Sequence, residues 1–202
     1  MRSDVRTEPA ASVSPGPPAA PPRTGRVVAV AAARRHQFSK QTAPVIHLLE
    51  GLGVEGDAHL GTTDQHRSHV RRDPTRTNLR QVHLLQGELF DEVLGSGHRV
   101  LPGQLGENVT TYGIDLLSLP VDTVLLLGQT AEVQVTGLRN PCRQIDGFQP
   151  GLLRLVVGRA ADGATVRRTG IMGVVRRGGE LRPGDQVSVV LPPLPHRPLA
   201  PV

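Results

Sequence analysis

Short runs of aliphatic and β-branched residues, each ending near a glycine- or proline-rich turn, recur along most of this chain. Runs of this length and composition are typical of strands. They lie at residues 26–31, 45–49, 78–85, 116–119, 123–127, 131–138, 171–176 and 187–191. Helical periodicity is confined to residues 85–94 and 149–157. The sequence therefore predicts a mostly β fold of the α+β class, a closed or nearly closed β-barrel with a few short helices.

The prolines are concentrated at the two ends of the chain. Eleven of the 18 lie there, six within residues 1–25 and five within residues 192–202. Segments of this kind cannot bury enough apolar surface to offset the conformational entropy that is lost when they become ordered. We therefore expect disordered tails at residues 1–25 and 192–202, on either side of one barrel domain at residues 26–191.

Composition excludes several classes of partner. The chain has three Phe, one Tyr and no Trp, and its formal net charge of +5 comes from scattered arginines with Lys40 as the single lysine. Few aromatic rings and no basic block argue against nucleic acid, whereas arginine suits phosphate and carboxylate groups, so we expect a small anionic ligand. Because no apolar run has the length of a membrane span and no signal peptide is present, we predict a cytoplasmic protein without membrane contact.

One cysteine, Cys142, follows the alternating run 131–138 directly after a proline. Arg139 and Arg143 flank it, and neighbouring cations favour the reactive thiolate form of cysteine. A lone cysteine can equally be a small buried hydrophobic residue. These residues alone leave both interpretations open.

Two glycine-rich segments carry polar side chains that could contact a ligand. Residues 51–61 contain four glycines with Asp57 and His59, and residues 101–109 contain Glu107 and Asn108. Residues 51–61 match neither a phosphate-binding loop nor a dinucleotide-binding motif. Glu107 and Asn108 could orient a ligand or only form hydrogen bonds within a tight turn. Lys40 could likewise contact a phosphate or be a solvated loop charge.

Three segments together resemble the MOSC domain, the C-terminal module of molybdenum-cofactor sulfurases that is also found as a free-standing bacterial protein. The segments are 53–59 (GVEGDAH), 102–108 (PGQLGEN) and 139–142 (RNPC). The resemblance covers roughly residues 26–191 and keeps the order and spacing of the motifs. Asp122 departs from it, since glycine is common at this turn, which puts the local turn geometry in question.

The resemblance implies a barrel-like fold and a role in sulfur or molybdenum-cofactor chemistry. In this family the cysteine carries sulfur as a persulfide or ligates the molybdenum of a bound pterin cofactor, so Cys142 is the expected catalytic residue and metal ligand. Cationic side chains contact the phosphate of the cofactor in family members that bind it. The expected cofactor-binding residues are Lys40, Asp57, His59, Glu107, Asn108, Arg139 and Arg143.

Three functions remain open under this resemblance. The chain could be a molybdenum-cofactor-dependent oxidoreductase that reduces N-hydroxylated small molecules, with electrons from a partner protein. It could be a sulfurtransferase with a persulfide on Cys142 and no metal. The pyridoxal-phosphate domain of fused sulfurases would not fit in a chain of 202 residues, so a cysteine desulfurase would then supply the sulfur. It could also be a non-catalytic module that binds a pterin or another anion.

Overall fold

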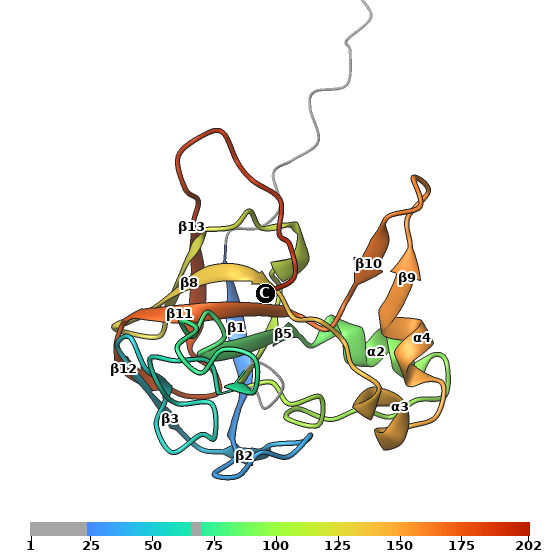
Figure 1. Ribbon diagram of the computed structural model, residues 1–202, viewed down its shortest axis with the longest axis horizontal. Helices are drawn as coiled ribbons and strands as arrows, with labels where there is room; N and C mark the ends of the chain where they lie inside the picture. Colours follow the sequence, from blue (N-terminus) through green and yellow to red (C-terminus); the bar gives the residue numbers. More distant parts are fainter. Residues whose placement is uncertain (1–23, 66–69) are drawn as a thin grey trace, which may run out of the picture.

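The computed structural model describes residues 24–65 and 70–202, and seven of its strands close into a barrel (Figure 1). Strand β13 pairs with both β7 and β1, which closes the sheet. Every neighbouring pair is antiparallel except β5 and β6, which run parallel. In barrel order the strands are β13 (Gln186–Val190), β7 (Val124–Leu127), β8 (Ala131–Leu138), β11 (Ile171–Arg177), β5 (Val82–Gln86), β6 (Val109–Tyr112) and β1 (Thr24–Ala32). The expected mostly β barrel is confirmed.

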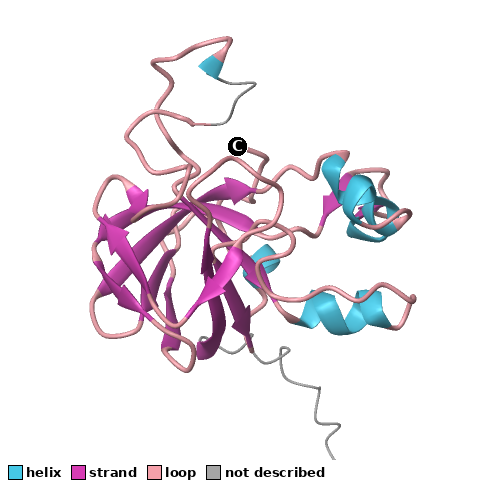
Figure 2. Cartoon of the chain, turned by 90° about the horizontal axis from the view of Figure 1, so that it is seen from below, coloured by secondary structure: helices cyan, strands magenta, loops and turns pink. Residues whose placement is uncertain are grey.

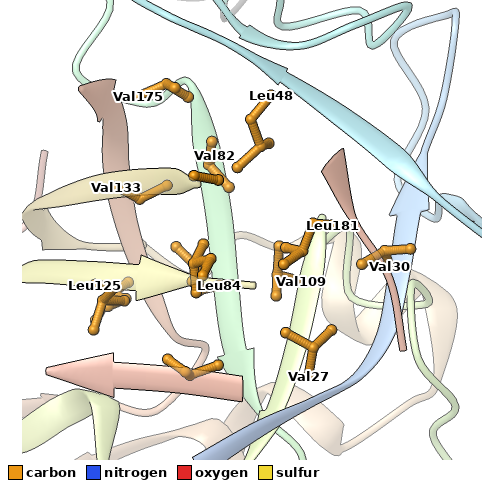
Figure 3. Packing of buried hydrophobic residues seen from close by; sticks show 14 of the residues in the cluster. Val27, Val30, Leu48, Val82, Leu84, Val109, Leu125, Val133, Val175 and Leu181 are labelled. Atoms are coloured by element: carbon orange, nitrogen blue, oxygen red, sulfur yellow. The ribbon is translucent and has the colours of Figure 1, made fainter. Parts of the chain in front are cut away.

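Every second side chain along the strands points inward, and these side chains fill the barrel interior. In β8 every second residue is buried, so Val133 and Val135 point inward while the residues between them are partly exposed. Successive side chains of a strand point to opposite faces, and inward positions therefore repeat with a period of two. The inward side chains of several strands, including Val27, Leu84 and Val109, meet in one apolar cluster (Figure 3).

Helices cover one side of the barrel rather than its interior. They are α2 (Glu88–Leu94), α3 (Gln144–Phe148) and α4 (Leu152–Val156), and in Figure 2 they lie to one side of the barrel strands. A second apolar cluster joins them to the outer face of β5 through Leu85. The four residues from Val82 to Leu85 are all buried, because β5 has the barrel core on one face and this cluster on the other.

The remaining elements are short. Strand β2 (Gln41–Ala43) pairs with the end of β1, and β3 (Ile46–Leu49) joins β4 (Gly53–Val54) and β12 (Gly179–Leu181) in a separate sheet. A protruding hairpin of β9 (Val157–Arg159) and β10 (Thr165–Arg167) follows α4 (Figure 1).

Several expected elements differ in kind or in bounds. Residues 116–119, expected as a strand, form the 3-10 helix η1 (Leu116–Ser118), which the Asp115 side chain caps by accepting a hydrogen bond from the Leu117 N–H. The expected helix 85–94 begins only at Glu88, because Leu85 and Gln86 belong to β5. Strands β2, β4, β6, β9, β10 and β12 and helix α3 were not anticipated.

The two expected tails have different outcomes. Residues 1–23 lie outside the described part of the chain. Residues 192–202, expected to be disordered, instead return to the barrel, where Ala200 O accepts a hydrogen bond of 2.8 Å from Leu138 N and Val202 N donates to Leu138 O at 3.3 Å. Strand β7 pairs only with residues 131–134 of β8, so the backbone edge near Leu138 is free to pair with this segment.

Candidate functional site

A cavity of about 110 Å³ opens where the loop after β8 meets the loops before β2, β5 and β6. Loops held by a rigid barrel are common places for binding residues. Five of the eight residues singled out from the sequence line this cavity, and they come from segments up to about 100 positions apart in the chain: Lys40, His59, Asn108, Arg139 and Cys142.

Glycines let two of these loops lie directly against each other. Gly103 has a φ of 83°, and a Cβ placed on it would lie 2.6 Å from the carbonyl oxygen of Lys40. Gly106, with a φ of 84°, approaches the carbonyl of Phe38 in the same way, at 2.7 Å. Only glycine fits such a close approach at a positive φ. The glycine-rich loop 101–109 therefore holds the segment that carries Lys40 at the cavity.

Cys142 is partly buried and faces the cavity rather than the barrel core. Its backbone position is defined by two hydrogen bonds, from Arg139 N to Gly170 O (3.0 Å) and from Ile145 N to Cys142 O (3.1 Å). The sulfur donates to Oε1 of Gln144 at 3.4 Å. Of the two interpretations left open by the sequence, the buried apolar residue does not describe this environment.

Arg139 carries a guanidinium group whose hydrogen-bonding capacity is mostly unused. Arg139 is only 8% exposed. Its Nη2 donates to Leu105 O at 3.4 Å, and its Nη1 is buried without a hydrogen-bond partner among the described residues. Burial lowers the pKa of Arg139, while the nearby Cys142 and Glu107 work against this shift. A buried donor without an acceptor is costly, so this cavity is suited to an anion.

Asp57 lies just behind the cavity wall and connects three of its residues. Oδ2 accepts from Lys40 Nζ (2.7 Å), Asn108 Nδ2 (3.1 Å) and Ala33 N (3.1 Å), and Oδ1 accepts from His59 N (3.0 Å) and Nδ1 (3.1 Å). Burial alone would raise the pKa of Asp57, but the hydrogen bonds from His59 and the charge of Lys40 hold it well below its usual range. Burial lowers the pKa of Lys40, against the attraction of Asp57.

Glu107 and Arg143 do not line the cavity. Glu107 is fully buried, and its Oε1 accepts from Gly103 N (2.5 Å) and Thr110 Oγ1 (3.1 Å), as expected for a residue that stabilises a turn. Burial raises its pKa. Arg143 is exposed at the N-terminal end of α3, outside the cavity lining.

Two cavity residues, Arg80 and His83, were not anticipated from the sequence. Burial lowers the pKa of Arg80, whereas the nearby Asp64 and Cys142 oppose this shift. His83 lies on the outer face of β5, where burial and then Arg139 lower its pKa to about 3, and its Nε2–H donates to Thr169 O at 2.7 Å. The sequence signal that could have identified His83 is its position inside the otherwise aliphatic run that forms β5.

The described part of the chain offers little for a bare metal ion. Within residues 24–65 and 70–202, no group of three or more His, Cys, Asp or Glu side chains is placed to hold one.

Among the same residues, no helix has the length and apolarity needed to cross a membrane.

Comparisons with solved structures show which fold this barrel shares. The YuaD protein from Bacillus subtilis superimposes with a TM-score of 0.67 at 25% identity, covering 82% of this chain and 95% of that one. YiiM from Geobacillus stearothermophilus gives a TM-score of 0.58 at 16% identity, with 82% of this chain and 75% of that one covered. YiiM from Escherichia coli gives 0.55 at 18% identity, with coverage of 83% and 71%.

Comparison with curated proteins found no match. The family model of the MOSC domain matches residues 61–188, which is more than half of the chain. This match includes Arg80, Asn108, Arg139 and Cys142, whereas Lys40, Asp57 and His59 precede it. The expected resemblance is thus confirmed, and the chain belongs to the MOSC domain family.

Proposed function

We propose that this chain binds a molybdenum cofactor, a molybdopterin, with the sulfur of Cys142 as the protein ligand of the metal. The observation that carries the proposal is the buried Nη1 of Arg139, which has no partner within the described part of the chain and belongs to the same cavity as the single cysteine. A soft thiolate suits a transition metal, and a buried guanidinium suits the anionic groups of such a cofactor.

The donor set fits a metal that arrives with most of its ligands. Because the described residues hold no cluster of three His, Cys, Asp or Glu side chains, a metal here would take few ligands from the protein. A cofactor that brings its own sulfur and oxygen ligands needs only one from the chain, and Cys142 can supply it. The cofactor would contribute two-electron redox chemistry at the metal, while the chain binds it and excludes water.

Cavity size limits how such a cofactor would lie. A volume of about 110 Å³ is below the roughly 300–1,000 Å³ of ordinary small-molecule sites, so only the metal end would enter the cavity. An adjoining groove shares Gln37 with the cavity and is lined by Arg34 and Arg35. We assign the phosphate to this groove, since Arg139 lies in the cavity with the metal end, Lys40 is already paired with Asp57 and Arg143 lies outside the lining.

With this cofactor the chain would act as an oxidoreductase on small molecules, and reduction of N-hydroxylated compounds is the reaction we propose. Such a reduction consumes two electrons and two protons and releases water. The electrons would come from a partner protein, and a cytoplasmic location would suit that exchange.

A second candidate is a sulfurtransferase in which Cys142 carries a persulfide and no metal stays bound. The partial exposure of Cys142 favours it, because a sulfur donor such as a cysteine desulfurase must reach the sulfur directly. The third possibility, a non-catalytic pterin- or anion-binding module, would use Arg139 and not depend on the sulfur.

The deciding experiment is elemental analysis for molybdenum, with intact mass, on protein expressed in a host that makes the pterin cofactor. We expect close to one molybdenum per chain in the wild type and a large loss in Cys142→Ser. Arg139→Ala should lower the molybdenum content, whereas Arg143→Ala serves as the matched control and should retain it.

Each alternative predicts a different result in the same samples. A molybdenum-free chain with a mass increase of one sulfur on the Cys142 peptide would favour the sulfurtransferase. Unchanged pterin binding in Cys142→Ser would favour the non-catalytic module.

A further inference from the structure

His59 has one ring nitrogen held by a carboxylate, and the other has no hydrogen-bond partner among residues 24–65 and 70–202. Nδ1 lies 3.1 Å from Oδ1 of Asp57, and the same oxygen accepts the backbone N–H of His59 at 3.0 Å. Asp57 is ionised, since its pKa is held well below the usual range, and an ionised carboxylate can only accept. Nδ1 therefore carries the proton of the neutral ring, and Nε2 is left with a lone pair.

The carboxylate that orients His59 is itself immobilised. Its other oxygen accepts from Lys40 Nζ at 2.7 Å, Asn108 Nδ2 at 3.1 Å and Ala33 N at 3.1 Å, and the Asp57 side chain is 2% exposed. A carboxylate fixed in this way sets the tautomer and orientation of a histidine and stabilises the imidazolium that forms when the ring takes up a proton.

His59 also faces the cavity that contains Cys142. It lines the cavity, and its side chain is 31% exposed. The ring of His36 packs edge-on against it, with centroids 5.1 Å apart. Among the described residues, no hydrogen-bond partner is found for His59 Nε2. The cavity volume of about 110 Å³ leaves room for several waters. A proton can therefore pass between His59 and Cys142 through water.

We propose that His59 is the acid–base residue of the Cys142 cavity, with Nε2 as the atom that exchanges the proton and Asp57 as the residue that positions it. When Cys142 meets a metal or a sulfane sulfur it must react as the thiolate. The S–H bond then breaks, the electron pair stays on sulfur, and the proton passes to Nε2. The inference takes from the proposed function only that Cys142 is the reacting group.

Several other charged or titratable groups face His59. Asp57 and His36 contact it, and four more groups line the same cavity: Lys40, Arg80, His83 and Arg139. His83 is excluded as the proton acceptor, since burial lowers its pKa to about 3 and its Nε2–H donates to Thr169 O. The cationic Lys40 and arginines have no lone pair to offer.

The first test is the tautomer of His59, measured by nitrogen-15 NMR of the histidine rings in the full chain without added metal. We expect the neutral His59 ring to be protonated at Nδ1, while His83, whose Nε2 donates to a carbonyl, is protonated at Nε2. A His59 ring protonated at Nε2 would overturn the proposal, and this measurement needs no variant.

The second test is the pH profile of Cys142 alkylation by iodoacetamide, which reads one site because the chain has one cysteine. His59→Gln should react about tenfold more slowly near neutral pH, because the thiol loses the base that takes up its proton. His47→Gln is the matched control, because His47 also faces carboxylates, Glu55 at 3.4 Å and Glu180 at 3.2 Å, but does not line the cavity.

An unchanged profile in His59→Gln would overturn the proposal, as would an equal effect of both substitutions. Both tests use the metal-free chain, so they can succeed even where molybdenum analysis rejects the proposed cofactor. Failure of this inference and failure of the proposed function are therefore separate results.

Discussion

Lys40 Nζ lies 2.7 Å from Oδ2 of Asp57, and the two side chains are only 4% and 2% exposed. The single lysine of the chain thus forms a buried ion pair at the wall of the cavity rather than a solvated loop charge. Removal of one partner from a buried pair leaves an uncompensated charge. Loss of either partner should therefore destabilise the wall of the cavity.

We expect Lys40→Met to lower the free energy of unfolding by about 3–5 kcal/mol, because Asp57 would keep a buried negative charge without its ammonium partner. Urea denaturation followed by circular dichroism measures this directly. Arg177→Met is a suitable control, since Arg177 pairs with Glu132 at 3.8 Å while 62% exposed, and should have little effect. Equal unfolding curves for Lys40→Met and the wild type would contradict the role assigned to the pair.

His83 should make the protein less stable as the pH falls. Its pKa is lowered from 6.5 to about 3 by burial, so between these values the unfolded chain binds a proton that the folded chain does not. The free energy of unfolding contributed by His83 is present above pH 6.5 and declines by up to about 1.4 kcal/mol per pH unit below it.

The measurement is urea denaturation of the wild type and His83→Gln at intervals between pH 4 and 7. Glutamine keeps a donor for Thr169 O but does not titrate, so the difference in stability between the two chains should shrink as the pH is lowered. A difference that stays constant with pH would show that His83 is not buried in the neutral form.

Arg139 should attract anionic reagents to Cys142. Its Nη1, which no described residue pairs with, belongs to the same cavity as the sulfur, whereas Arg143 is exposed and outside the lining. We expect Arg139→Ala to reduce the ratio of alkylation rates for iodoacetate over iodoacetamide by about fivefold or more, corresponding to roughly 1 kcal/mol of lost electrostatic attraction. Arg143→Ala should leave the ratio nearly unchanged, and an equal reduction in both variants would argue against a specific anion site.

Asp122 adopts a backbone conformation that usually requires glycine. Its φ is 70°, and it is the non-glycine residue with a positive φ in the described part of the chain. Its carboxylate accepts from Gln134 Nε2 at 2.7 Å and from Arg197 Nη2 at 2.6 Å. The departure from the family pattern noted at this turn thus preserves the turn geometry.

Asp122→Ala should lower the free energy of unfolding by about 1–2 kcal/mol, because alanine keeps the left-handed strain and loses both hydrogen bonds. Asp122→Gly loses the same bonds but relieves the strain, so its stability should lie close to that of the wild type. Thermal or urea unfolding of both variants distinguishes them, and an alanine variant as stable as the glycine one would refute the argument.

Local patterns in the sequence were sufficient to predict the β-barrel and the position of Cys142 after a strand. The alternating run 131–138 became β8 with the expected bounds, and the inward residues of that strand are the apolar ones. Alternation depends only on the two-residue period of a strand, so it can be read without knowledge of the partners. The short strands β2, β9 and β12 carry no such pattern and were missed.

The cavity itself was decided by tertiary structure. Lys40 and Asp57 are 17 positions apart, Asn108 and Asp57 are 51 apart, and residues 192–202 add backbone hydrogen bonds at the end of β8. His83 lines the cavity because β5 is buried on both faces, and Arg80 joins it from the loop before that strand. The sequence by itself determined which residues are apolar, flexible or reactive. Closure of the barrel determined which charged groups share a buried volume, because the strength and pairing of buried charges depend on distances through space that no local pattern encodes.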